Sequence, residues 1–158
     1  MPPKTVFEHD AKFDQLLLRL KATQVELAAR YRRYVPLLVK VSPDLSDDEI
    51  KSVAGKVLLH AVDGVVATNT TVSRAGLGEI PNAQEIGGLS GQPLFSLALR
   101  SVLLFNEHLQ GRVPIIACGG IASTEQAERM FDAGASLIQV HTGFLYQGRS
   151  LVRTLARL

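Results

Sequence analysis

The chain has 158 residues, of which 46% are hydrophobic and 20% are charged, and its formal net charge at pH 7 is +2. These values are typical of a globular domain with one hydrophobic core, and so small a charge gives no reason to expect nucleic acid as a partner. The single cysteine, Cys118, excludes an internal disulfide and fits a reducing compartment. No apolar run is long enough to cross a bilayer, so we expect this chain alone to be cytoplasmic.

The first element that the sequence predicts is a helix over residues 11–33. Its apolar residues recur at helical spacing and form one stripe, which is interrupted by the polar Gln24 and consists of Phe13, Leu16, Leu17, Leu20, Leu27 and Tyr31. Such a stripe normally packs against a core, while the charged face on the other side is normally solvated.

Four apolar runs, each followed by a helical segment, predict strands that are buried on both faces. These runs lie at 35–41, 65–67, 114–118 and 137–140. Ser46 and Glu49 form a capping box before the first of the helices. Pro93 suits the start of the second and Ser123 suits the N-cap of the third, and the last helix is expected to begin near Ser150.

Alternating strands and helices predict an α/β fold with a parallel sheet, for which two architectures are open: a doubly wound sheet and part of a (β/α)8 barrel. Both bind ligands at the carboxyl ends of their strands. The turns at 119–120 and 141–143 match the phosphate site that follows the last two strands of a barrel, and no G-x-G-x-x-G follows the first strand. We therefore favour the C-terminal half of a (β/α)8 TIM barrel, with four parallel strands and their helices preceded by one helix.

The stretch 63–71 passes abruptly from an apolar run into Thr68, Asn69, Thr70 and Thr71. Each buried amide or hydroxyl must find a hydrogen-bond partner or cost free energy. Two interpretations are open: a polar turn after the strand, or a pocket in which a ligand supplies the partners. The polar or glycine residues that end the other three strands favour the pocket.

Five motifs stand in order along the chain: VKVSPDL at 39–45, DGVVATNTT at 63–71, GGLSGQPL at 87–94, GGI at 119–121 and GASLIQ at 134–139. Together they resemble the C-terminal half of the quinone-linked (class 2) dihydroorotate dehydrogenases. The resemblance implies that residues 1–158 are a partial FMN-binding (β/α)8 barrel domain. It also implies a flavin oxidoreductase of pyrimidine biosynthesis, which oxidises dihydroorotate to orotate, passes the electrons to a membrane quinone, and lies peripherally on an inner membrane.

The resemblance matches three strand-end and loop residues to the flavin. Lys40, Thr68 and Gly91 correspond to cofactor contacts, and a cation at Lys40 would stabilise an anionic reduced flavin. The alternative for Lys40 is a side chain that reaches from the strand end to solvent. Cys118 is expected only to fill a strand end as a small buried residue.

The resemblance matches the remaining site residues to the cofactor phosphate and the substrate. Gly120, His141 and Thr142 correspond to a phosphate cradle built from backbone N–H groups and a helix N-terminus. Asn69 and Thr70 correspond to the pair that hydrogen-bonds orotate. The sequence departs from the family at His141, where tyrosine is frequent, and we expect no metal ligands.

The resemblance also limits what the chain is expected to do alone. The family's catalytic base is a serine of the N-terminal half, so no catalytic residue is assigned and the isolated chain is expected to be inactive. A half barrel leaves strand edges unpaired, so the N-terminal half or a second copy is an expected partner. The alternatives are a different phosphate-binding barrel enzyme and a truncated, inactive half barrel.

Overall fold

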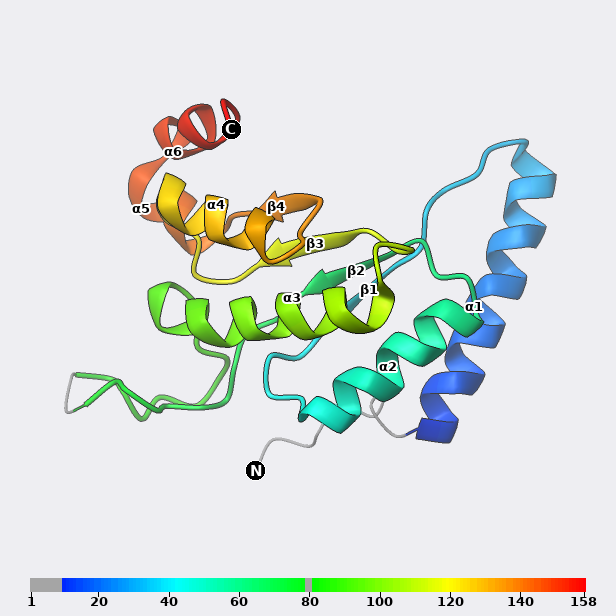
Figure 1. Cartoon of the computed structure of the whole chain (residues 1–158), viewed down its shortest axis with the longest axis horizontal. Coiled ribbons are helices and arrows are strands. Elements are labelled where there is room, and N and C mark those ends of the chain that lie inside the picture. The colour runs from blue at the N-terminus through cyan, green and yellow to red at the C-terminus, as the bar shows by residue number, and fades with distance from the viewer. Residues whose placement is uncertain (1–9, 79–80) are drawn as a thin grey trace.

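The computed structural model describes residues 10–78 and 81–158. The elements, drawn in Figure 1, follow one another as α1 (Asp10–Tyr31), β1 (Leu38–Val41), α2 (Asp47–Leu59), β2 (Gly64–Ala67), the 3-10 helix η2 (Gln92–Leu94), α3 (Phe95–Leu109), β3 (Ile115–Cys118), α4 (Thr124–Asp132), β4 (Leu137–Gln139), α5 (Thr142–Gln147) and α6 (Arg149–Leu155). The α/β class and the single helix before the first strand are confirmed.

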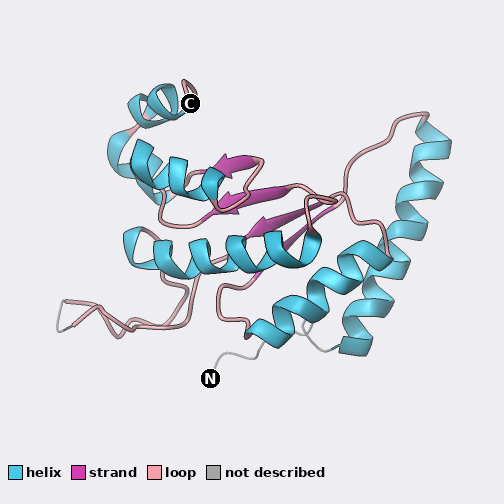
Figure 2. Cartoon of the chain, viewed as in Figure 1, coloured by secondary structure: helices cyan, strands magenta, loops and turns pink. Residues whose placement is uncertain are grey.

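The strands form one parallel sheet in the order β1-β2-β3-β4, as Figure 2 shows. Ala67 and Ala117 pair across β2 and β3 and are fully buried, because they belong to a hydrophobic cluster with residues of α2 and α3. The opposite face is partly open: Leu38 and Leu137 in the two outer strands are 39% and 60% exposed. The sheet is therefore packed on its helix side and open on the side that faces inward in a barrel.

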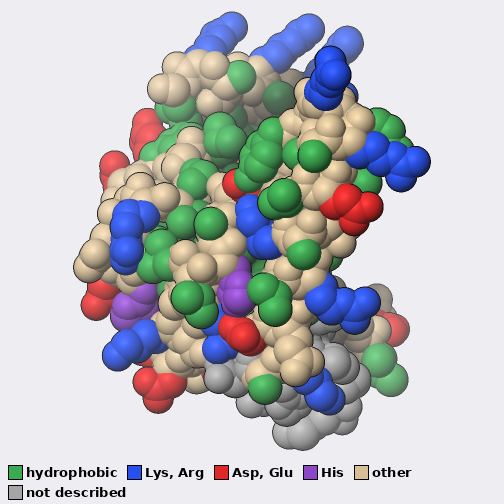
Figure 3. All heavy atoms as spheres, turned by 90° about the vertical axis from the view of Figure 1, so that its right-hand side faces the viewer, with side chains coloured by type: hydrophobic (Ala, Val, Ile, Leu, Met, Phe, Trp, Pro, Cys, Tyr) green, Lys and Arg blue, Asp and Glu red, His purple; other side chains and the backbone are tan. Residues whose placement is uncertain are grey.

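Helix α1 differs from its prediction in how much of its apolar stripe is buried. Phe13 and Leu17 are 5% and 0% exposed, but Leu27 and Tyr31 are 43% and 65% exposed. The helix lies beside the C-terminal end of α2, where Asp14 Oδ1 is 2.8 Å from His60 Nε2. Figure 3 shows hydrophobic side chains on this face among those of lysine and arginine. The expected packing of the stripe against the core therefore holds only for its first half, since no described element covers the second half of α1. The helix ends at Tyr31, and Arg32 leaves it with φ 50°.

Strand β1 is shorter and more exposed than predicted. It begins at Leu38, and Val35, which was expected inside the strand, is 59% exposed. The expectation of burial on both faces is wrong for β1 and also for β4, whose Leu137 is 60% exposed, because both are outer strands of the sheet. Val65 in the inner strand β2 is fully buried.

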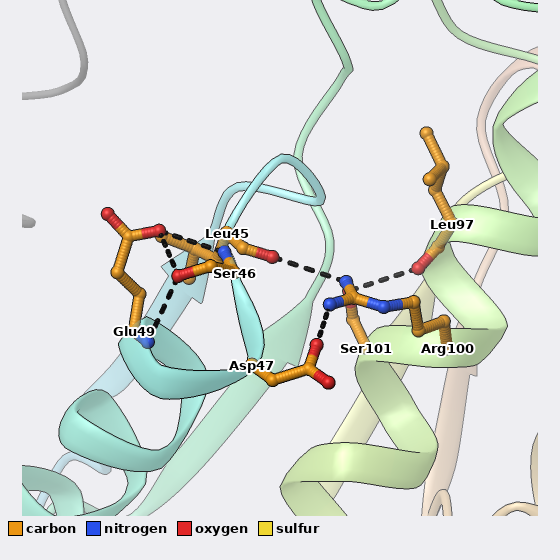
Figure 4. Close-up of polar contacts among 7 residues, drawn as sticks. All are labelled: Leu45, Ser46, Asp47, Glu49, Leu97, Arg100 and Ser101. Atoms are coloured by element: carbon orange, nitrogen blue, oxygen red, sulfur yellow. Dashed lines mark hydrogen bonds and ion pairs between the residues drawn. The ribbon is translucent and has the colours of Figure 1, made fainter.

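The start of α2 confirms the predicted capping box (Figure 4). The Glu49 amide donates to the Ser46 hydroxyl at 3.3 Å, and the Ser46 amide donates to the Glu49 carboxylate at 2.8 Å. Arg100 of α3 donates to the Leu45 carbonyl at 3.2 Å and forms an ion pair with Asp47. The cap is local in sequence, but the arginine also fastens the start of α2 to α3.

The other three predicted helix starts are confirmed, but one further helix was not predicted. Ser123 caps α4 by accepting from the Gln126 amide at 3.2 Å, and Pro93 lies in the first turn of η2, directly before α3. The last helix, α6, begins at Arg149, next to the predicted Ser150, but an unpredicted helix, α5, precedes it from Thr142, and Gly148, with φ 62°, separates the two. The glycine-containing turn after β4 concealed this extra helix.

None of the helices in the described part of the chain combines the length and the apolar character that a membrane crossing requires.

Candidate functional site

One cavity of about 240 Å³ lies at the carboxyl ends of the four strands. Its lining includes every residue to which the sequence analysis assigns a binding role, namely Lys40, Thr68, Asn69, Thr70, Gly91, Gly120, His141 and Thr142. A second hollow is lined by residues 82–86 alone, so it brings together no groups from separate elements. The strand-end cavity is therefore the candidate site.

The first wall of the cavity comes from β1 and β3. Lys40 pairs with Val66 in the sheet register, and its Nζ donates to the Cys118 Sγ at 3.8 Å. The thiol is half-buried and lines the cavity. The prediction that Cys118 merely fills the strand end is therefore incomplete. Its neighbour Lys40 lies 78 positions away in the chain, and only the strand register brings the two together.

The second wall is the polar run after β2. The Thr68 amide donates to the Cys118 carbonyl at 2.5 Å, and the Asn69 amide donates to the Val41 carbonyl at 2.7 Å, so both residues are tied to neighbouring strands. The Ala67–Thr68 peptide bond is cis. The Asn69 Oδ1 accepts from the Thr70 amide at 2.9 Å, which orients the Asn69 side-chain amide.

The polar run therefore divides into two parts with different partners. Thr68, Asn69 and Thr70 line the cavity, whereas Thr71 is 1% exposed and donates its hydroxyl to Asp44. Asp44 also accepts from the Val72 amide at 2.9 Å. The pocket interpretation thus fits the first three residues, and the turn interpretation fits Thr71. The VKVSPDL motif contains Asp44, but its partner could not be inferred from sequence.

The third wall is the glycine turn after β3. Gly120 has φ 70°, and a Cβ there would lie 2.6 Å from the backbone nitrogen of Phe95, at the start of α3. Gly119 is equally restricted, because its Cβ would lie 2.7 Å from that of Ala98. Backbone groups rather than side chains therefore form this wall, which is the arrangement that backbone N–H groups need to bind an anion.

The fourth wall joins the start of α5 to the loop before α3. The Thr142 hydroxyl donates to the Ser90 hydroxyl at 2.9 Å, and a Cβ on Gly91, which has φ 82°, would lie 3.2 Å from the Thr142 Cγ2. His141 precedes α5 and is exposed at the cavity. Ser90 was quoted in a motif but given no role, because its contact with Thr142 spans 52 positions.

The four walls together suit an anionic ligand that also carries hydrogen-bonding groups. They combine a cation at Lys40, a side-chain amide and hydroxyl at Asn69 and Thr70, and a wall of bare backbone at Gly119–Gly120. In residues 10–78 and 81–158, no group of three or more His, Cys, Asp or Glu side chains could hold a metal ion.

Comparison with known proteins finds one protein family. A model of the family described as dihydroorotate dehydrogenase matches residues 3–157. A relative from Idiomarina loihiensis, named dihydroorotate dehydrogenase (quinone), is 49% identical over 148 residues, which cover 94% of this chain and 44% of the relative. A relative of the same name from Methylococcus capsulatus has the same identity and coverage.

Solved structures show the same likeness. The crystal structure of DHODH from Eimeria tenella in complex with ferulenol matches 98% of this chain with a TM-score of 0.90 and 28% sequence identity, and the match covers 45% of that protein. The ligand-free enzyme from the same organism matches 75% of this chain with a TM-score of 0.73 and 37% identity. The chain thus spans less than half the length of the relatives that it matches.

Proposed function

Because this chain belongs to the dihydroorotate dehydrogenase family, we propose that its cavity binds FMN and one edge of dihydroorotate or orotate, as part of a quinone-linked enzyme of pyrimidine biosynthesis. The observation that supports the proposal is the meeting of the eight candidate site residues, from four strand ends and their loops, in one cavity. Since the chain spans less than half of its relatives, the complete activity, the substrate and the quinone acceptor are all part of the proposal.

The cofactor-binding part of the proposal uses six residues. Lys40, Thr68 and Gly91 would contact the flavin ring, and Gly120, His141 and Thr142 would hold its phosphate. When bound, FMN would take up the hydride equivalent of dihydroorotate and pass the electrons on to a quinone. The Lys40 ammonium would place a positive charge beside the ring, and the bare Gly120 backbone would let the phosphate approach closely.

The substrate-binding part of the proposal uses Asn69 and Thr70. An orotate ring carries donors and acceptors in its plane, and a side-chain amide next to a hydroxyl can match both kinds of group. The contact between the Asn69 Oδ1 and the Thr70 amide holds the Asn69 side chain in one orientation before any ligand binds. Preorganisation of this kind reduces the entropy that binding has to overcome.

We further propose that a polypeptide of these 158 residues does not turn over dihydroorotate. The resemblance puts the catalytic base in a serine of the other half of the barrel. The half-exposed inner face at Leu38 and Leu137 also favours pairing with that half or with a second copy, which a mass measurement in solution would detect.

Titration with FMN, followed by the change in flavin absorbance and fluorescence, tests the proposed function. We expect the chain to bind FMN, and orotate to perturb the spectrum of the bound flavin. We expect Lys40→Met to weaken FMN binding, while Lys51→Met, on the exposed side of α2, leaves it unchanged. Binding of a phosphorylated sugar but not of FMN would instead favour a different phosphate-binding barrel enzyme. Dye reduction that depends on dihydroorotate would contradict the expected inactivity.

A further inference from the structure

The side chain of Arg74 ties together the two ends of the loop between β2 and α3. Its Nη2 donates to the Glu85 carbonyl at 2.7 Å and to the Gly87 carbonyl at 2.8 Å. Its Nη1 lies 3.3 Å from the Val72 and Ser73 carbonyls and 3.5 Å from the Thr71 carbonyl. One guanidinium thus binds main-chain oxygens on both the outgoing segment 71–73 and the returning segment 85–87.

These two segments continue directly into two different walls of the cavity. Asn69 and Thr70 precede the outgoing segment, and Ser90 and Gly91 follow the returning one. Next to the arginine, Thr71 and Leu89 form an antiparallel bridge, with N···O distances of 2.8 and 3.1 Å. The distance between the two walls therefore depends on how the two segments are held.

The returning segment also touches a proposed substrate-binding side chain. A Cβ on Gly88 would overlap the Thr70 side chain, so the Gly88 backbone packs directly against Thr70. Arg74 fixes the neighbouring Gly87 carbonyl, and a shift of that segment would change the space available to the Thr70 hydroxyl. The arginine thus acts on Thr70 from both sides, through the Thr71 carbonyl and through Gly87–Gly88.

We propose that Arg74 is a positioning residue that holds Thr70 in register with the Ser90–Gly91 wall, and thereby determines how tightly the cavity binds the substrate ring. This inference rests on the proposed function, since it takes Thr70 as a substrate contact. The planar fork of the guanidinium is required, because a lysine has the same charge but carries its donors on one nitrogen, which cannot span both segments.

Three variants test the inference: Arg74→Ala, Arg74→Lys and, as a control, Arg112→Ala. Arg112 is an exposed arginine that makes one carbonyl contact, 3.3 Å from Leu109, between α3 and β3. Hydrogen exchange of the Thr71 and Leu89 amides reports on the two segments without any ligand. In the FMN-loaded chain, titration with orotate, followed by the flavin spectrum, reports on the substrate wall separately from cofactor affinity.

We expect both Arg74 variants to exchange the Thr71 and Leu89 amides several-fold faster than the wild type. We also expect them to bind orotate about tenfold more weakly, the loss that corresponds to one hydrogen bond, with a smaller change in FMN affinity. The control should match the wild type in all three measurements. Since Arg74→Lys keeps the charge, it provides a folded variant should Arg74→Ala not fold.

Unchanged exchange at Thr71 and Leu89 in the Arg74 variants would overturn the inference. Faster exchange with unchanged orotate affinity would also overturn it, because the arginine would then shape the loop without positioning Thr70. Wild-type behaviour of Arg74→Lys would also overturn it, because charge alone would then suffice and the guanidinium would not be required. Failure of the wild-type chain to bind FMN would instead overturn the proposed function, and the exchange rates would still decide whether Arg74 fixes the two segments.

Discussion

The two ends of strand β2 carry polar residues that lie close together in sequence but have different surroundings. At the start of the strand, Asp63 accepts hydrogen bonds from the Leu37 amide at 2.7 Å, from Gln24 at 2.8 Å and from the Tyr34 hydroxyl. At the other end, Asn69 and Thr70 have exposed side chains that line the cavity. A polar residue beside a strand is thus structural where the protein completes its hydrogen bonds, and a candidate ligand contact where it faces a cavity.

Asp63 and its hydrogen-bond partners Gln24, Tyr34 and Leu37 hold α1 and the segment before β1 against the start of β2. Burial alone raises the pKa of Asp63, but hydrogen bonds from the Leu37 amide, Tyr34 and Gln24, with the charge of Lys21, outweigh it and lower the pKa from 3.8 to about 2. The Lys21 Nζ lies 3.6 Å from the carboxylate. The ionised form is therefore the one that stabilises the fold.

Replacing Asp63 should have the largest effect on stability. We expect Asp63→Ala to lower the free energy of unfolding by about 3 kcal/mol, since it leaves several donors around a largely buried position without an acceptor. Urea unfolding measures the change, and FMN affinity per folded chain should stay the same. Asp132→Ala, at the exposed C-terminal end of α4, is the control. A weaker FMN affinity in folded Asp63→Ala would contradict the conclusion that Asp63 is structural and independent of the cavity at the other end of β2.

The same carboxylate predicts how stability depends on pH. Because the pKa of Asp63 is lower in the folded chain, its contribution is complete above pH 3.8 and is lost as the pH falls toward 2. The shift corresponds to about 2 kcal/mol. Urea unfolding of the wild type and Asp63→Asn between pH 6 and about pH 2 isolates this contribution, since other carboxylates titrate in both chains. If the free energy of unfolding changed with pH in the same way for the wild type and Asp63→Asn, the predicted lowering of the Asp63 pKa would be excluded.

Glycine 120 offers a comparison within the cavity itself. Gly120→Ala should cost about 2 kcal/mol, because its Cβ would meet the backbone of Phe95 and its φ is positive. Gly76→Ala is the matched control: its φ is 80°, but nothing lies within 4 Å of the added carbon, so only about 1 kcal/mol of backbone strain is expected. Thermal unfolding of both variants measures the difference, and equal losses would show that the close approach to α3 is unimportant.

Asn69→Ala should have the smallest effect on stability, less than about 0.5 kcal/mol, because the side chain is exposed. It should nevertheless weaken the binding of orotate to the FMN-loaded chain. Thr71→Val is the contrasting variant from the same run: it removes a buried hydroxyl bonded to Asp44 and should cost about 1 kcal/mol. If Asn69→Ala destabilised the chain more than Thr71→Val, the division of residues 68–71 into a cavity-lining part and an internally bonded Thr71 would be wrong.

Features that depend on neighbouring residues were predictable from the sequence. The capping box of Ser46 and Glu49 and the cap at Ser123 depend on contacts across three positions, so the pattern alone identifies them. That the candidate site residues line one cavity was also predictable, because each lies at or near the end of a strand and parallel strands bring those ends to one edge. Their individual roles remain predictions.

Features that depend on which element packs against a given face were not predictable from the sequence. The exposed half of α1 and the exposed β1 have apolar sequences that resemble buried ones, and only the order of the strands places them at the outside. Helix α5 was missed because Gly143 indicates a turn, although a Cβ there would lie 2.6 Å from the Ile121 carbonyl oxygen and glycine is needed for packing.

By itself, then, the sequence determined the α/β class, the number of strands and the set of residues that meet at their ends, since periodicity, caps and motif order are local properties of the chain. Only the tertiary structure decided which polar groups the protein satisfies internally. Asp63 meets Gln24 across 39 positions, and Lys40 meets Cys118 across 78. Such partners are set by sheet register and helix packing, so the distinction between a structural carboxylate at one end of β2 and a cavity wall at the other exists only in the folded chain.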